Sequence, residues 1–166
     1  MENNKIYTFT HIPETLEDFK NLKEAQLTQP QDSVALLILA LCQYQHNKEA
    51  SLEMIQFLKG PALLSPYEKQ FIQERLNQYE YIPYSYIENT SPENNYTITQ
   101  EIQIKVISYP QSFTEENYGT IYVQSTGADA PRPVKIRYQP STQKWFLQDQ
   151  MLLAQIKKPV ADDPWA

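Results

Sequence analysis

The chain has 166 residues, of which 41% are hydrophobic and 20% are charged, so it can bury a core and is not a disordered polypeptide. Its formal net charge of −6 repels phosphate groups, and we therefore expect neither nucleic-acid binding nor binding to anionic membranes. There is one cysteine, no signal-peptide pattern, and no apolar run longer than residues 34–42. A disulfide framework, secretion and a membrane span of about 20 residues are thus all unsupported, and we expect a cytoplasmic protein.

Hydrophobic residues in the first half of the chain recur at helical spacing. This pattern predicts four helices, over residues 15–27, 33–45, 48–59 and 66–76. Thr15 and Ser65 suit N-caps, and Glu68 completes a capping box with Ser65. Gly60 is expected to end the third helix. The second helix is apolar nearly all round, which indicates that it lies at the centre of the domain.

In the second half the hydrophobic period changes to two, which is typical of half-buried strands. The predicted strands cover residues 96–106, 119–125, 133–139 and 144–150, and residues 5–10 are a candidate for the edge of the same sheet. We therefore predict an α+β fold, with a bundle of about four helices packed on an antiparallel sheet of three to four strands. The expected single domain spans residues 1–166. Its parts are a helical half (1–80), a connection (81–95), a sheet half (96–156) and a tail (157–166).

Four tyrosines lie between residues 79 and 86, where the helical half meets the connection. Flexible linkers are poor in aromatic residues, so we expect this segment to pack between helices and sheet. The alternative is a tyrosine-rich surface for a partner.

Catalytic residue types are scarce in this chain. The only histidines are His11 and His46, and the only thiol is Cys42. Cys42 and His46 lie one helical turn apart, but Cys42 ends an apolar run in which a thiol stays enclosed and protonated. Metal-binding motifs and glycine-rich phosphate loops are absent from the sequence. We accordingly predict no enzymatic activity, no metal and no cofactor.

Residues 125–138, "STGADAPRPVKIRY", are predicted to form a stiff connection between two strands. Gly127 is expected to adopt a positive φ, and prolines fix the approach to the second strand. Asp129 is positioned in sequence to pair with Arg132. The alternative is a preset recognition loop whose ordering cost is reduced by proline.

Five sequence blocks are distinctive when taken together, although each is weak singly. They are "LKGPALLSPYEKQFIQERL", "YIPYSYIENTSPENNYT", "STGADAPRPVKIR", "KWFLQDQMLL" and "DPWA". In these blocks the chain resembles a family of bacterial proteins of unknown function, and the resemblance runs from about residue 34 to residue 166. It implies a bacterial origin and one coherent unit, and it transfers no catalytic residues. The last two strands also faintly resemble the closing hairpin of cystatin-like or NTF2-like folds, which is an analogy of pattern only.

Trp165 lies in the tail, after a proline. An indole in water is unfavourable, so we expect Trp165 to dock on its own domain. The alternative is a linear motif that enters a pocket of a partner.

Our leading hypothesis is a non-catalytic, cytoplasmic, bacterial protein-binding module of the immunity, adaptor or accessory type. Its partner is expected to be a protein, and a basic partner is favoured because acidity speeds encounter with a basic surface. The predicted contact residues are Tyr81, Tyr84, Tyr86, Asp129, Arg132 and Trp165.

An alternative hypothesis is a small-ligand pocket between helices and sheet, with or without weak enzymatic activity. The predicted lining residues are Tyr96, Tyr122, Arg137, Tyr138 and Trp145. A third hypothesis is a scaffold or self-assembling subunit. The sequence leaves the partner and the oligomeric state open.

Overall fold

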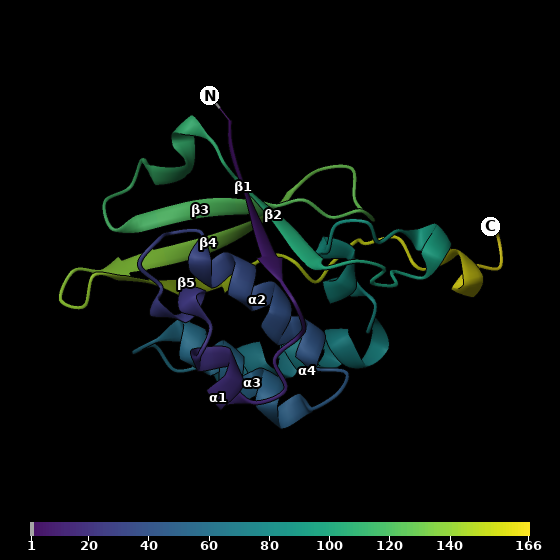
Figure 1. The fold of residues 1–166 in the computed structure, drawn as a ribbon, viewed down its shortest axis with the longest axis horizontal. Helices are drawn as coiled ribbons and strands as arrows, with labels where there is room; N and C mark the ends of the chain where they lie inside the picture. The colour runs from purple at the N-terminus through teal and green to yellow at the C-terminus, as the bar shows by residue number, and fades with distance from the viewer. Residues whose placement is uncertain (1) are drawn as a thin grey trace.

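The computed structural model of the protein describes residues 2–166 and confirms the α+β class (Figure 1). Within these residues there are four α-helices and five strands, arranged as a helical layer against an antiparallel sheet. The helices are α1 (Leu16–Lys20), α2 (Asp32–Gln43), α3 (Lys48–Lys59) and α4 (Pro66–Gln78). The strands are β1 (Asn3–Phe9), β2 (Ile102–Ser108), β3 (Tyr118–Val123), β4 (Arg132–Gln139) and β5 (Lys144–Gln150).

The strands follow one another in the sheet in chain order, β1-β2-β3-β4-β5, and every neighbouring pair is antiparallel. The early strand predicted over residues 5–10 does join the edge, as β1, and it pairs with β2 from Asn3↔Ser108 to Phe9↔Ile102. The sheet therefore has one strand more than the three or four predicted for the second half alone.

Helix α2 is the centre of the molecule, and all twelve of its residues are buried. It contacts α3 on one side and β2, β4 and β5 on the other, and Figure 1 shows it between the strands and the remaining helices. This confirms the prediction made from its uniformly apolar sequence. A helix with no polar face is stable only when it is enclosed on all sides.

The predicted helix ends are confirmed where a cap defines them. The hydroxyl of Thr15 accepts from the N–H of Asp18, and Ser65 and Glu68 form the reciprocal capping box. Gly60, with φ of 63°, ends α3 in a conformation that favours glycine.

The single helix predicted over residues 15–27 is wrong. It is divided into α1 and a 3₁₀ turn, η1 (Lys23–Gln26), which ends at Leu27 with φ of 58°. The turn carries the Leu27 carbonyl to the edge of β5, where it accepts from the N–H of Trp145. This contact between distant segments competes successfully with a continuous helix.

The strand predicted over residues 96–106 is wrong at its start, since β2 begins at Ile102. Asn95 and Tyr96 have φ of 59° and 51°, outside the extended region. Contacts of the Tyr96 side chain, described below, hold this residue away from the sheet.

The connection packs as predicted, through two 3₁₀ turns, η2 (Ile82–Tyr86) and η3 (Pro92–Asn94). The tail forms a further turn, η5 (Val160–Asp162), which lies beside η3 (Figure 1). One hydrophobic core includes residues of the helices, the connection, the sheet and the segment that follows β5 as far as Ile156. No helix in residues 2–166 has the length and hydrophobicity that crossing a membrane requires.

Candidate functional site

The tyrosines of the connection hold it in place by donating hydrogen bonds to backbone carbonyls. Tyr81 Oη donates to the carbonyl of Ile156 at 3.1 Å, Tyr84 Oη to that of Cys42 at 3.0 Å, and Tyr86 Oη to that of Leu152. A buried hydroxyl and a buried carbonyl each need a partner, so these bonds join α2, the connection and the segment that follows β5.

Tyr86 was predicted to contact a partner, and this prediction is wrong. Its side chain is buried, because its ring lies in the core and its hydroxyl is used by the Leu152 carbonyl. Tyr81 and Tyr84 also make internal bonds, but both stay partly exposed.

The glycine of the loop over residues 125–138 has a different role from the predicted one. Gly127 does not have a positive φ; the one glycine that does is Gly60. A Cβ at Gly127 would overlap the Tyr96 hydroxyl and lie 2.8 Å from Cγ2 of Ile156. The carbonyl of Gly127 also accepts from the N–H of Lys157 at 2.9 Å. Glycine is required here for the close approach of three segments.

The predicted ion pair between Asp129 and Arg132 is absent from residues 2–166. The Arg132 guanidinium instead donates to the carbonyls of Gln155 at 3.0 Å and Ala130 at 3.4 Å, and Asp129 is exposed. These two backbone carbonyls take the place that sequence reasoning gave to the carboxylate. Arg132 thus joins the segment after β5 to the start of β4.

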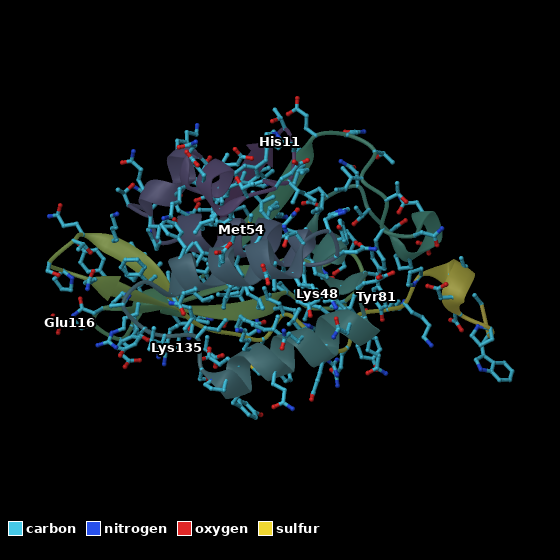
Figure 2. The ribbon with its side chains drawn as sticks, turned by 90° about the horizontal axis from the view of Figure 1, so that it is seen from below. His11, Lys48, Met54, Tyr81, Glu116 and Lys135 are labelled. Atoms are coloured by element: carbon cyan, nitrogen blue, oxygen red, sulfur yellow. The ribbon has the colours of Figure 1, made fainter. Side chains whose placement is uncertain are left out.

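Tyr81 and Tyr84 come together with Tyr96 in one open cleft, which we name the tyrosine cleft. Its volume is about 500 Å³. The residues that line it come from the end of α2, the connection, the segment before β2 and the tail: Gln45, His46, Glu80, Tyr81, Tyr84, Asn95, Tyr96, Thr97, Ile98, Pro159, Ala161 and Asp162. Figure 2 shows Tyr81 at the end of the molecule where the tail passes, far from Glu116 and Lys135 at the opposite end.

The aromatic part of the cleft is rigid. Tyr81 and Tyr96 are stacked, with ring centroids 5.7 Å apart and an angle of 9° between the planes, and the Tyr96 hydroxyl donates to the carbonyl of Lys157. Tyr84 Oη lies 3.3 Å from Nε2 of His46. Tyr96 is itself buried, so the ring surface that is open to a cation belongs to the partly exposed Tyr81 and Tyr84.

Two carboxylates, those of Glu80 and Asp162, line the cleft. Burial is the main cause of the raised pKa of the Tyr84 hydroxyl, and Cys42 and Glu80 add to it. Burial likewise raises the pKa of Tyr81; Tyr79 and Asp162 add to this, and the charge of Arg75 acts against it.

No lysine or arginine lines the tyrosine cleft within the described part of the chain. Four other cavities each include such a residue: Lys59 in two of them, Lys20 with Lys69 in the third, and Lys5 with Lys23 in the fourth. Of these five cavities, the tyrosine cleft is therefore the one that has carboxylates but no lysine or arginine in its lining.

The residues predicted to line a ligand pocket do not line one cavity. Tyr122 packs edge-on against Tyr109, and Arg137 lies over Tyr118. Along β4, Ile136 is buried on the helix side, so Arg137 points to the opposite face.

The other predicted pocket residues are distributed between two places. Tyr138 and Trp145 form a tilted pair 4.9 Å apart, and Phe113 packs against Trp145. Tyr96 alone lies in the tyrosine cleft. Arg137 and Tyr138 both line one cavity of about 220 Å³, whereas Tyr96, Tyr122 and Trp145 do not, so the five predicted residues share no common pocket.

Trp165 does not dock on its own domain, contrary to the prediction. Its side chain is 93% exposed. The backbone N–H of Trp165 donates to the carboxylate of Asp163 at 2.9 Å, and the backbone N–H of Ala166 donates to the Asp163 carbonyl at 3.2 Å. This turn around Pro164 orders the segment without bringing the indole to the core.

A second cavity, the Lys59 groove, lies between α4 and β5. It has a volume of about 180 Å³ and a mostly apolar lining that includes Leu64, Phe71 and Leu147. Lys59 is buried there, and its ammonium donates to Glu68 at 2.7 Å and to the carbonyl of Gln148 at 3.2 Å. The groove is smaller than the roughly 300 Å³ at which small-molecule sites begin.

The structure confirms that Cys42 is enclosed, and burial raises the pKa of its thiol. Its helical neighbour His46 faces Tyr84. Among residues 2–166, no three His, Cys, Asp or Glu side chains are placed to hold a metal ion together.

Sequence reasoning missed His46, Glu80 and Asp162 as members of the cleft. Glu80 does stand between two tyrosines in "YEY", which is a usable signal. Nothing in the sequence brings Asp162 to these residues, because only the folded tail does so.

The comparison with protein families matches residues 11–160 to a domain of unknown function, DUF6935. The chain belongs to the DUF6935 family. This confirms the resemblance seen in the sequence blocks. The DUF6935 match includes every residue that lines the tyrosine cleft except Ala161 and Asp162, and it begins after β1. No curated protein and no solved structure matches the chain.

Proposed function

We propose that this chain is a cytoplasmic bacterial protein-binding module without catalytic activity, and that its tyrosine cleft receives a lysine or arginine side chain of a basic partner. The observation that supports this proposal is the composition of the cleft: two partly exposed tyrosine rings, Tyr81 and Tyr84, and two carboxylates, with no lysine or arginine among its lining residues. A cationic side chain can meet both ring faces and carboxylates there, and an anionic ligand would meet only repulsion.

A side chain of a protein fits this cleft better than a free small molecule does. Seven of the lining residues are exposed: Gln45, His46, Glu80, Asn95, Thr97, Ala161 and Asp162. Small-molecule sites bury most of the ligand surface, whereas an open cleft needs the rest of a partner to exclude water around the bound group. Rigid tyrosines supply contact area at a low cost in conformational entropy, and the net charge of −6 attracts a basic partner.

The experiment is an NMR titration of the isotope-labelled chain. The titrant is a peptide whose one charged side chain is an arginine. The matched control is the same peptide with citrulline, which keeps the shape of arginine and removes its charge. We expect the arginine peptide to shift the amide signals of residues around Tyr81 and Tyr84, and the citrulline peptide to have little effect.

Two variants locate the interaction without removing any tyrosine. Glu80→Gln and Asp162→Asn keep the size of each side chain and remove its charge, and each is expected to weaken binding by up to about five-fold, as for an exposed ion pair. Tyr67→Ala, on α4, is the control, because Tyr67 is 78% exposed and lies outside the cleft. Equal binding of both peptides, unchanged affinity in Glu80→Gln and Asp162→Asn, or signal shifts centred elsewhere would each refute the proposal.

A further inference from the structure

We propose that β1 is an interface between two copies of this chain, which pair antiparallel through their β1 strands about a two-fold axis at Ile6. The two sheets would then continue into one another. This inference is independent of the tyrosine cleft.

The two edges of the sheet differ. The outer edge of β5 is covered, since the N–H of Trp145 donates to the Leu27 carbonyl at 2.9 Å and Lys59 donates to the Gln148 carbonyl at 3.2 Å. β1 pairs with β2 over all seven of its residues, and the backbone of β1 makes no hydrogen bond to any other segment of residues 2–166. An open edge of this length is a template for another strand.

The sequence of β1, "NNKIYTF", is complementary to itself about Ile6. The axis sets Ile6 against Ile6, Lys5 against Tyr7, and Asn4 against Thr8 of the second copy. Ile6 is 58% exposed, and the pairing would cover it with its own equivalent. Lys5 is the only charged residue of the strand, and it does not face itself, so like charges are not opposed.

The hollow beside β1 has a balanced set of charges. The hydroxyl of Tyr7 donates to the carboxylate of Asp32 at 2.6 Å. Asp32 and Glu24 line a hollow of about 440 Å³ along residues 5–8, together with Lys23 as the one cation from outside the strand.

Lys5 already lies over the Tyr7 ring of its own chain, 4.8 Å from the centroid. The second copy satisfies the edge in backbone bonds and covers the apolar side chain of Ile6. One strand pair is a small interface, so we expect a weak dimer that dissociates on dilution.

Cysteine cross-linking tests the axis directly. Residues directly opposite in an antiparallel pair have Cα atoms about 4.5–5.5 Å apart, within the range that a disulfide spans. Ile6→Cys is therefore expected to form a covalent dimer under mild oxidation. Thr8→Cys is the matched control, because it is exposed on the same face but lies four residues along the strand from its equivalent, about 14 Å away. The native Cys42 is buried and does not interfere.

Sedimentation of the unmodified chain and of two charged variants completes the test. We expect concentration-dependent dimers for the unmodified chain and for Thr8→Lys, which faces Asn4. Ile6→Lys, which faces another lysine, should be monomeric with an unchanged melting temperature. A monomer at every concentration, or Thr8→Cys cross-linking as readily as Ile6→Cys, would overturn the proposal. Strand addition by a different protein, with no self-pairing, would overturn it as well.

Discussion

Helix α2 and the tyrosine connection are both enclosed, but different forces enclose them. α2 is buried through apolar side chains, among them Leu39 and Leu41, and needs no directional partner. The connection depends on hydroxyls that reach the carbonyls of Cys42, Leu152 and Ile156. Apolar burial tolerates many sequences, whereas each hydroxyl must meet one acceptor. Because their hydroxyls, and not their whole rings, hold the connection in place, Tyr81 and Tyr84 stay partly exposed and line the cleft.

The largest expected effect tests the apolar half of this comparison. Leu39→Ala removes a fully buried side chain from α2 and is expected to lower the free energy of unfolding by about 2–5 kcal/mol. Denaturant unfolding followed by circular dichroism measures it. Leu63→Ala is the control, since Leu63 is 82% exposed, and a comparable loss there would contradict the central role of α2.

Gly127→Ala tests the close approach beside the connection. The added methyl group would collide with Tyr96 and Ile156, so we expect a loss of about 1–3 kcal/mol from overpacking. Thermal unfolding measures the loss. Because the Tyr96 hydroxyl is part of the collision, Tyr96→Phe combined with Gly127→Ala should cost less than the sum of the two single changes. Additive losses would show that the loop avoids the collision by moving.

Tyr86→Phe tests the directional bonds of the connection. The ring stays in the core, and the Leu152 carbonyl loses its donor, so we expect a loss of about 1–2 kcal/mol. Tyr67→Phe serves as the reference, because the hydroxyl of this exposed residue makes no hydrogen bond within residues 2–166. If both variants unfold at the same denaturant concentration as the parent, hydroxyl bonding does not hold the connection.

The smallest effect concerns a third kind of contact, the ion pair of Lys59 with Glu68. Burial acts to raise the pKa of Glu68, but the hydrogen bonds from Lys59 and Ser65 and the charge of Lys59 together lower it. A carboxyl whose folded pKa lies below its unfolded value stabilises the protein above the unfolded pKa, and this stabilisation is lost as the pH falls through the folded pKa.

Glu68 is partly exposed, with 35% of its side chain accessible, so the acid-dependent loss should stay below about 1 kcal/mol. The free energy of unfolding, measured from neutral to acidic pH, should fall less steeply in Glu68→Gln than in the parent chain. Identical pH profiles would show that other groups cause the acid sensitivity.

Most of the fold could be predicted because its signals are local. Ser65 and Glu68 meet within one helical turn, Gly60 ends the helix that precedes it, and strand alternation needs only nearest neighbours. Errors arose where a distant segment decides the local conformation. Leu27 is drawn to Trp145, and Tyr96 is held by Lys157.

The amino-acid sequence by itself determined the class of the fold, the buried helix, most strand positions and the family. The tertiary structure decided the partner of Arg132, the role of Gly127, the exposure of Trp165 and the gathering of the tyrosine cleft. The physical reason is range. Propensity, capping and hydrophobic period act over a few residues, whereas the cleft and the tail contacts join groups that are close only after the chain has folded.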